Sequence, residues 1–207
     1  MNEQLLKMNG LSVEILDALS FESHLGIPLK NNLHYFDKDL LIAELVAMTE
    51  WLDEQEILSG IALDYRVKSF DSILLKYDRY YPDHQTRKVF NDILGFRAFC
   101  DSYDQILEEE SVQFRIADMS SGKAVDDGYR GVHVYYQKSG KYYPIEIQFN
   151  TLFDRQLNNW LHDYLYKKNY PIETGRILRE KYESGLIRNE HEFKEVLNNV
   201  LSGSERS

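Results

Sequence analysis

The chain has 207 residues and a formal net charge of −10, with 43% hydrophobic and 28% charged residues. This length and composition predict one folded domain with terminal helical additions, and the acidic total argues against a protein that coats nucleic acid through a broad basic surface. No apolar run is long enough for a bilayer, the N-terminus lacks the pattern of a signal peptide, and the single Cys100 excludes an intrachain disulfide. We therefore expect a cytoplasmic protein without a membrane segment.

Apolar residues at helical spacing predict helices over 11–24 and 38–57. A strand-like alternation follows at 63–67, and Ser69 then caps a helix that runs to Tyr80. Farther along the chain we expect strands at 93–100 and 112–117, a short helix from Asp101 to Glu110 between them, and a hairpin over 129–149 with its turn at 138–140. Helices over 151–168, 172–184 and 189–201 and a frayed tail complete an α+β fold, in which helices flank a mostly antiparallel sheet of about five strands.

A locally basic segment stands out in this acidic chain. Residues 61–90 hold six basic groups and four acidic ones, a balance of +2 that leaves −12 for the remainder. Such a segment suggests a site for a compact polyanion such as a nucleoside triphosphate. It is equally typical of a solvated helix face, and charge alone does not decide between the two.

Two carboxylates lie on predicted strands near these cations. Asp92 opens the strand DILGFR, in which Gly95 allows a close backbone approach and Arg97 follows. Glu146 alternates with aliphatic residues in YPIEIQF, so its side chain faces the side of the strand opposite to theirs. Because Mg²⁺ prefers one or two carboxylates together with phosphate oxygens, the pair suits metal-assisted phosphoryl chemistry. Taken singly, each carboxylate is more typical of a salt-bridged or edge residue, and only the pair with the nearby cations makes the two interpretations equal.

Five motifs in order resemble the synthetase domain of RelA/SpoT proteins, a nucleotidyltransferase-like fold: RVKSFDSILLK (66–76), DILGFR (92–97), GYRGVH (128–133), EIQFNT (146–151) and HDYLYK (162–167). The resemblance covers about half the chain, from 60 to 168. It implies an enzyme that moves the β,γ-pyrophosphate of ATP to a nucleotide 3′-hydroxyl with Mg²⁺ as cofactor. The same resemblance suggests three parts within one folded domain: an N-terminal helical region (1–58), a synthetase core (59–168) and C-terminal helices with a tail (169–207).

The resemblance also implies roles for individual residues. Arg66 and Arg97 would stack on adenine, Lys68, Ser72 and Lys76 would hold the ATP phosphates, and Asp92 and Glu146 would bind Mg²⁺, with Glu146 helping to deprotonate the acceptor. Tyr129 would stack on the acceptor base, and His162 with Lys167 would lie on a covering helix. The remaining acceptor-side residues are expected to contact phosphates, position the loop or complete the pocket floor: Arg130, His133, Gln148 and Thr151.

The departures from the family pattern fall on the acceptor side. Val125 stands where a lysine is usual, although Lys123 lies near enough to substitute if the loop bends, and Gly131 and Asn150 replace a serine and an arginine. Farther on, Arg155 and Leu157 stand in place of an asparagine and a tryptophan, and Trp160 is out of register. Because a guanine pocket depends on such base-edge and phosphate contacts, these changes indicate a different acceptor.

One branch of small synthetases fits these changes: toxic small alarmone synthetases that pyrophosphorylate the 3′ CCA end of tRNA. Membership of that branch would imply a neutralising protein antitoxin as partner. The first sixty residues are too few for a hydrolase domain and lack a His-Asp metal set, so the chain is expected to make its product and not to degrade it. The candidate tRNA-binding cations are Lys30, Arg79, Arg87, Lys88, Arg155, Lys167 and Lys168.

Two other interpretations stay open. The chain could be an alarmone synthetase that makes (p)ppGpp, or an adenine analogue, from free nucleotides such as GDP and GTP. It could also be a catalytically inactive module that senses nucleotides or binds a protein. The presence of both Asp92 and Glu146 counts against the inactive module.

Overall fold

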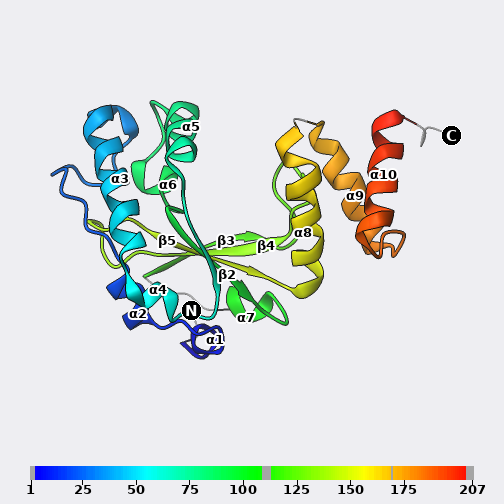
Figure 1. Cartoon of the computed structure of the whole chain (residues 1–207), viewed down its shortest axis with the longest axis horizontal. Coiled ribbons are helices and arrows are strands. Elements are labelled where there is room, and N and C mark those ends of the chain that lie inside the picture. The colour runs from blue at the N-terminus through cyan, green and yellow to red at the C-terminus, as the bar shows by residue number, and fades with distance from the viewer. Residues whose placement is uncertain (1–2, 109–112, 169, 204–207) are drawn as a thin grey trace. The chain divides into compact units, whose positions relative to one another are not determined.

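The computed structural model describes residues 3–108, 113–168 and 170–203. Its first half contains α1 (Glu3–Met8), α2 (Val13–Ala18), η1 (Leu33–Tyr35), α3 (Lys38–Asp53), α4 (Glu56–Ser59), β1 (Asp64–Val67), α5 (Phe70–Tyr80), α6 (Thr86–Val89) and β2 (Leu94–Phe99). Its second half contains α7 (Asp104–Leu107), β3 (Phe114–Met119), β4 (Gly131–Tyr136), β5 (Ile145–Asn150), α8 (Leu152–Tyr164), η2 (Tyr166–Lys168), α9 (Ile172–Glu183) and α10 (Glu190–Ser202). The α+β class predicted from the sequence is confirmed (Figure 1).

A five-stranded, mostly antiparallel sheet has the order β1-β2-β5-β4-β3. Strands β1 and β2 pair antiparallel, with Arg66 opposite Gly95 and Asp64 opposite Arg97. The hairpin partners β4 and β5 lie side by side, and β5 also pairs with β2. This order places the middle of β2, which carries Gly95, next to the strand that carries Glu146.

Contacts within the chain group it into two compact units. Unit 1 contains Met1–Ala98, Asp104–Ala117 and His133–Phe149, and unit 2 contains Phe99–Tyr103, Asp118–Val132 and Asn150–Ser207. The boundary crosses four of the sheet strands near their ends and does not fall in a linker. The three-part division at 58 and 168 stays a prediction.

Unit 1 has its core on one side of the strands. The side chains of Phe96, Val134, Tyr136 and Ile147 are fully buried, and each alternates along its strand with a more polar neighbour. Helix α3 contacts both α5 and β1 and buries its own apolar stripe. Because strand residues alternate between faces, the polar residues of β1, β2, β4 and β5 share the opposite side.

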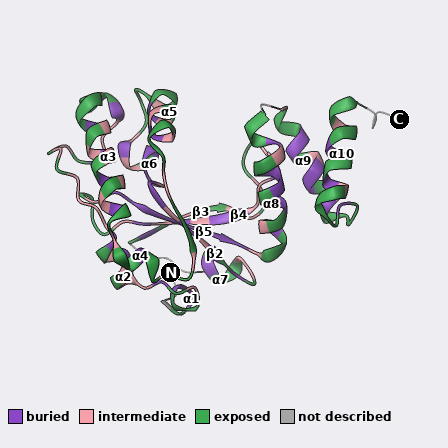
Figure 2. Cartoon of the chain, in the orientation of Figure 1, coloured by how far each residue is buried: buried purple, intermediate pink, exposed green. Residues whose placement is uncertain are grey.

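Unit 2 has a core of its own among α8, α9 and α10. Helix α9 contacts α8 on one side and α10 on the other. These helices share one cluster of buried side chains that includes Leu157, Trp160, Leu178, Tyr182 and Phe193. In Figure 2 the three helices are buried where they meet and exposed on their outer sides.

Some predicted boundaries were wrong, and the first helix differs most. Instead of 11–24, α2 ends at Ala18, and residues 21–23 are extended: Phe21 O accepts from Tyr143 N, and Ser23 N donates to Lys141 O. Pairing with a distant segment has overridden the helical spacing, as tertiary contacts often do.

The other differences are smaller. Helix α7 begins at Asp104 and not after an Asp101 cap, and both hairpin strands are shorter than predicted. The predicted helix over 38–57 is divided into α3 and α4, and α1 and α6 were not predicted. Part of the predicted 101–110 helix and most of the predicted tail lie outside the described residues. Among those described, no helix is long and apolar enough to cross a membrane.

Candidate active site

An ion-pair cluster in unit 1 joins two of the predicted phosphate-binding lysines to one carboxylate. Lys68 Nζ lies 2.8 Å from Asp92 Oδ2, and Lys76 Nζ lies 2.8 Å from Asp92 Oδ1. Three separate segments meet here, because Lys68 follows β1, Lys76 lies on α5, and Asp92 precedes β2. The backbone bond from Lys68 N to Ile93 O, 2.8 Å long, brings the end of β1 beside Asp92. Two ammonium groups therefore share one carboxylate.

Ser72 lies one helical turn before Lys76, on the same side of α5. Its hydroxyl shares a 2.9 Å hydrogen bond with that of Ser69, the residue that precedes the helix. Ser72 is half-buried, and its position relative to Lys76 agrees with the prediction from spacing. Its contact with a phosphate stays a prediction.

Glu146 is a buried carboxylate in the middle of β5, with 6% of its surface exposed. Its Oε1 lies 2.9 Å from His133 Nδ1 on β4, and its Oε2 accepts a 2.7 Å hydrogen bond from Gln148 Nε2. Burial alone would raise the pKa of Glu146, but the hydrogen bond and charge of His133 and the hydrogen bond from Gln148 outweigh it and lower the pKa. Glu146 is therefore a carboxylate at neutral pH, ready to bind a cation or accept a proton.

Three predicted site residues, Arg66, Glu146 and His133, lie in one row across the sheet. Arg66 on β1 is opposite Gly95 on β2, and a methyl group at Gly95 would meet Glu146 Oε2 on β5 at 3.4 Å. The row continues to His133 on β4 through its contact with Glu146. Arg97 lies two residues after Gly95, on the same side of β2 and opposite Asp64. The absence of a side chain at Gly95 leaves room beside the Glu146 carboxylate.

The donor set fits magnesium. Among residues 3–108, 113–168 and 170–203, no group of three or more His, Cys, Asp or Glu side chains could hold a metal by itself. Mg²⁺ is usually held by one or two carboxylates and by substrate phosphates, so Asp92 and Glu146 suit a metal that arrives with a nucleotide.

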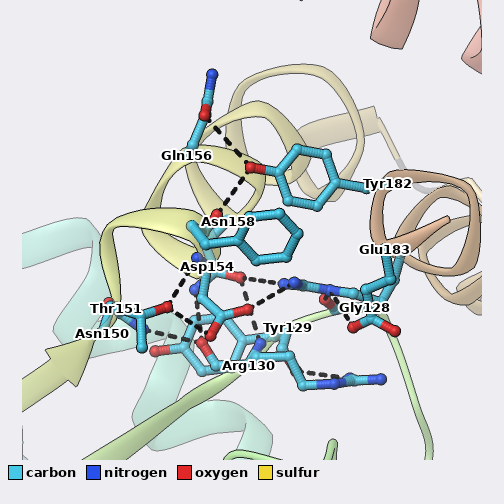
Figure 3. Close-up of polar contacts among 12 residues, drawn as sticks. Gly128, Tyr129, Arg130, Asn150, Thr151, Asp154, Gln156, Asn158, Tyr182 and Glu183 are labelled. Carbon is cyan, nitrogen blue, oxygen red and sulfur yellow. Dashed lines mark hydrogen bonds and ion pairs between the residues drawn. The ribbon is translucent and has the colours of Figure 1, made fainter. Parts of the chain in front are cut away.

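Tyr129 lies in unit 2, in a segment that we call the acceptor loop (126–131). Lys123 Nζ lies 5.0 Å from the centre of the Tyr129 ring and 2.6 Å from Asp127 Oδ2. Lys123 thus lies beside Tyr129, and its substitution for the usual lysine at position 125 stays a prediction. Figure 3 shows this loop beside the start of α8.

Arg130 is occupied by the acceptor loop itself. Its Nη1 and Nη2 bond the two oxygens of Asp126 at 2.8 and 2.9 Å, and Nη1 also donates to Tyr129 O at 2.9 Å. The hydrogen bond from Arg130 holds the pKa of Asp126 below its usual value. Arg130 thus bonds residues of its own loop, and both roles predicted for it stay predictions.

Thr151 is the N-cap of α8. Its hydroxyl accepts from Asp154 N at 3.1 Å and donates to Asp154 Oδ2 at 2.9 Å. Asn150, which stands where the family usually has arginine, donates to Arg130 O at 2.8 Å. Both side chains are thus held by the protein, and the predicted contribution of Thr151 to an acceptor pocket stays a prediction.

The predicted nucleic-acid-binding cations divide into three sets by their surroundings. Lys30, Arg87 and Lys88 line two cavities of unit 1, of about 520 and 360 Å³, which adjoin because Arg87 and Gly140 line both. The guanidinium of Arg155 lies 5.2 Å from the Phe99 ring centre, and the residue is half-buried. Less of its side chain is therefore accessible to a nucleic acid than the prediction requires. The remaining predicted residues are exposed on α5, α8 and η2: Arg79, His162, Lys167 and Lys168.

Several residues that build the site were not predicted. Arg179 on α9 is fully buried against Asp154 and Asn158 of α8, and Arg115 on β3 stacks on Tyr135, 4.2 Å from its ring centre. Arg179 follows Leu178 within an amphipathic helix, where an arginine usually marks the solvated side, so the pattern concealed it. Arg115 alternates along a strand as Arg66 does, and that signal could have identified it.

Comparisons with known proteins find one family and several similar solved structures. A family model described as a region found in RelA/SpoT proteins matches residues 65–170, about half the chain. No curated protein matches the chain. Among solved structures, small alarmone synthetase 1 from Bacillus subtilis bound to its product pppGpp is 25% identical with a TM-score of 0.45, and 82% of this chain and 92% of that one are covered.

Two further solved structures are similar. Small alarmone synthetase 2 from Bacillus subtilis is 21% identical with a TM-score of 0.43, covering 83% of this chain and 100% of that one. A GTP pyrophosphokinase family protein from Streptococcus pneumoniae is 22% identical with a TM-score of 0.41, covering 79% and 91%.

Proposed function

The chain belongs to the RelA/SpoT family, and from this premise we propose that it transfers the β,γ-pyrophosphate of ATP to the 3′-hydroxyl of a tRNA end. The observation that carries the proposal is the Lys68–Asp92–Lys76 cluster in the same unit as the buried carboxylate Glu146. Cations for a triphosphate, carboxylates for Mg²⁺ and a base for a hydroxyl are the parts that this transfer needs.

ATP would be held mainly by side chains of unit 1. Lys68, Ser72 and Lys76 would bind its phosphates, and the planar guanidiniums of Arg66 and Arg97 would stack on adenine. As phosphate oxygens take over the two ammonium groups, Asp92 would be released to share Mg²⁺ with Glu146. The metal would then neutralise charge on the phosphates during transfer.

The transfer itself would be a displacement at the β-phosphorus. The acceptor 3′-oxygen forms a bond to that phosphorus while the bond to the oxygen shared with the α-phosphorus breaks, and AMP leaves. Glu146 would receive the hydroxyl proton, and His133, 2.9 Å from its Oε1, would hold the carboxylate in place. Tyr129 would stack on the acceptor base, a contact worth about 1–3 kcal/mol in single-stranded sites.

The two adjoining cavities favour a polynucleotide acceptor over a free nucleotide. Their described lining includes six fixed cations and the single carboxylate Glu22: Lys30, Arg87, Lys88, Arg115, Lys138 and Lys141. Tyr135 also lines the smaller cavity, and its hydroxyl lies 3.4 Å from His133 Nδ1, the partner of Glu146. Tyr135 and His133 thus connect the smaller cavity to the proposed base, and the cavity cations would hold successive phosphates of a strand.

Labelling from γ-labelled ATP tests the acceptor directly. We expect deacylated tRNA to be labelled in preference to GDP, GTP or ADP, and removal of its terminal adenosine to abolish labelling. Efficient conversion of GDP or GTP with unlabelled tRNA would replace this proposal by the alarmone synthetase alternative. No labelled acceptor at all, with ATP-analogue binding intact, would favour the inactive sensing module.

Charge reversal tests the cationic cavities. Arg87→Glu and Lys88→Glu should impair transfer to tRNA, and added salt should reduce transfer to tRNA more steeply than transfer to a free nucleotide. Arg79→Glu, which changes a cation outside the cavities, is the matched comparison and should have a smaller effect. Equal effects of all three on tRNA transfer would mean that the strand does not follow the cavities.

A tRNA-modifying enzyme of this kind would arrest translation, so a neutralising protein partner belongs to the proposal. Induced expression should stop cell growth, and Glu146→Gln should remove that toxicity. Rescue by a co-expressed neighbouring gene product, accompanied by a complex of the two proteins, would identify the antitoxin.

A further inference from the structure

The backbone of the acceptor loop is held on both sides of Tyr129. Before it, Gly128 O accepts a 2.8 Å hydrogen bond from Arg179 Nε. After it, Arg130 O accepts bonds of 2.8 and 2.7 Å from the amides of Asn150 and Asn158, and Arg130 N donates to Asn158 Oδ1 at 3.3 Å. The residue proposed to stack on the acceptor thus lies between two fixed peptide groups (Figure 3).

Arg179 connects these contacts. Its side chain is fully buried, and besides Gly128 O it bonds Asp154 Oδ1 at 2.6 Å and Asn158 Oδ1 at 3.1 Å. Asp154 is held in turn by Thr151 and by the hydroxyl of Tyr103 at 2.7 Å. A buried guanidinium is costly unless its fork is matched by acceptors, and three different acceptors match it here.

Helix α9 also touches the acceptor loop through its backbone. A methyl group at Gly175 would lie 1.9 Å from Asp127 O, and one at Gly128, where φ is +86°, would lie 2.3 Å from Gly175 O. One turn separates Gly175 from Arg179, so both face the loop from the same side of α9. The loop therefore has a defined position on this helix.

We infer that Arg179 is a positioning residue for the acceptor: through Gly128 O and Asn158 it sets the backbone from which Tyr129 presents its ring. The inference rests on the proposed role of Tyr129. Apolar packing would hold α8 against α9 at least as well as a buried ion pair. The polar contacts do something that apolar packing would not: Arg179 and its partner Asn158 both bond peptide groups that flank Tyr129.

Arg179→Lys tests this role because it keeps the positive charge that Asp154 needs but cannot reach three acceptors in one plane. Arg176→Lys is the matched control, since Arg176 is exposed on the same helix and pairs with Glu180. We expect Arg179→Lys to raise the KM for the acceptor about tenfold or more, as for loss of a charge-assisted hydrogen bond. The affinity for a non-hydrolysable ATP analogue should stay within about twofold of wild type, the scatter expected of uncoupled sites.

A double-mutant cycle separates positioning from general stability. In a Tyr129→Ala background, Arg179→Lys should have little further effect on the acceptor KM, because the ring that it positions is gone. Fully additive effects, or an equal loss of ATP-analogue affinity, would overturn the inference.

Hydrogen exchange gives a readout that does not need activity. The Arg130 amide should exchange faster in Arg179→Lys than in wild type or Arg176→Lys, and unchanged exchange would overturn the inference. Wild-type protein that labels no acceptor would overturn the proposed function, and with it the acceptor role, while the exchange result still shows whether Arg179 holds the loop.

Discussion

The two units of the molecule use charge in opposite ways. In unit 1, Asp92 pairs with Lys68 and Lys76, and these side chains are 11–21% exposed, so an incoming phosphate can replace the carboxylate. In unit 2, Arg179 is fully buried and bonds a peptide oxygen, a carboxylate and an amide. The contacts in unit 1 can be replaced by contacts with a ligand, whereas the buried contacts in unit 2 suit a fixed backbone geometry. Substitutions should therefore affect catalysis in unit 1 and geometry or stability in unit 2.

The largest effect is expected from the carboxylates of unit 1. Glu146→Gln and Asp92→Asn should each lower the transfer rate by about a thousandfold or more, because an amide supplies neither charge nor a proton acceptor. Initial rates with labelled ATP at saturating Mg²⁺ measure the loss, and circular dichroism should show an unchanged fold. Glu54→Gln, on an exposed residue of the same unit, is the control. Activity within a few-fold of wild type in either variant would refute the assigned roles.

The next effect concerns the backbone contact in unit 2. Gly175→Ala should lower the free energy of unfolding by about 3 kcal/mol, because overpacking against Asp127 O outweighs the roughly 1 kcal/mol that alanine gains in a helix. Gly140→Ala is the matched control, since its new methyl group would meet nothing within 4 Å. Thermal unfolding measures both variants, and equal midpoints would mean that α9 and the loop move apart freely.

A smaller effect is expected at the two arginines that are proposed to stack on adenine. Arg66→Ala and Arg97→Ala should each weaken binding of a non-hydrolysable ATP analogue several-fold to tens-fold, since a stacked cation contributes about 0.5–2 kcal/mol. Titration calorimetry checks this, with Arg79→Ala at the far end of α5 as control. Unchanged affinity in both variants would place adenine elsewhere.

The smallest effect is the pH dependence from Glu146. Because its pKa is lowered in the folded protein from an ordinary value of 4.5, it contributes stability above that value, and this contribution is lost as the pH falls through the folded pKa. The difference in melting temperature between wild type and Glu146→Gln should therefore shrink as the pH is lowered below 4.5. A difference that stays constant would mean that Glu146 titrates normally in the folded chain.

The same contrast explains what the sequence could reveal. The fixed spacing of strands and helices covers the proposed site residues of unit 1, which are Asp92, Glu146 and the lysines. Periodicity and motif order therefore predicted the α+β fold and grouped these residues into one proposed site. Arg179 contacts Gly128 across 51 positions of the chain. No local period encodes such a contact, because it depends on how α9 packs on α8.

The first predicted helix failed for a related reason. Residues 21–23 end the stretch 11–24, whose apolar spacing suits a helix, but they bond to residues 141–143, far away in the sequence. Long-range pairing of this kind decides between helix and strand wherever local preference is weak.

The sharing of Asp92 between two lysines has a consequence for how the binding of ATP and the binding of Mg²⁺ are coupled. One carboxylate between two ammonium groups leaves the cluster with a surplus positive charge, which repels a free dication and attracts a polyphosphate. ATP and Mg²⁺ should thus bind with positive linkage, each increasing the affinity for the other by the same factor. Such a protein would respond to the concentration of the metal–nucleotide complex and would remain indifferent to magnesium alone.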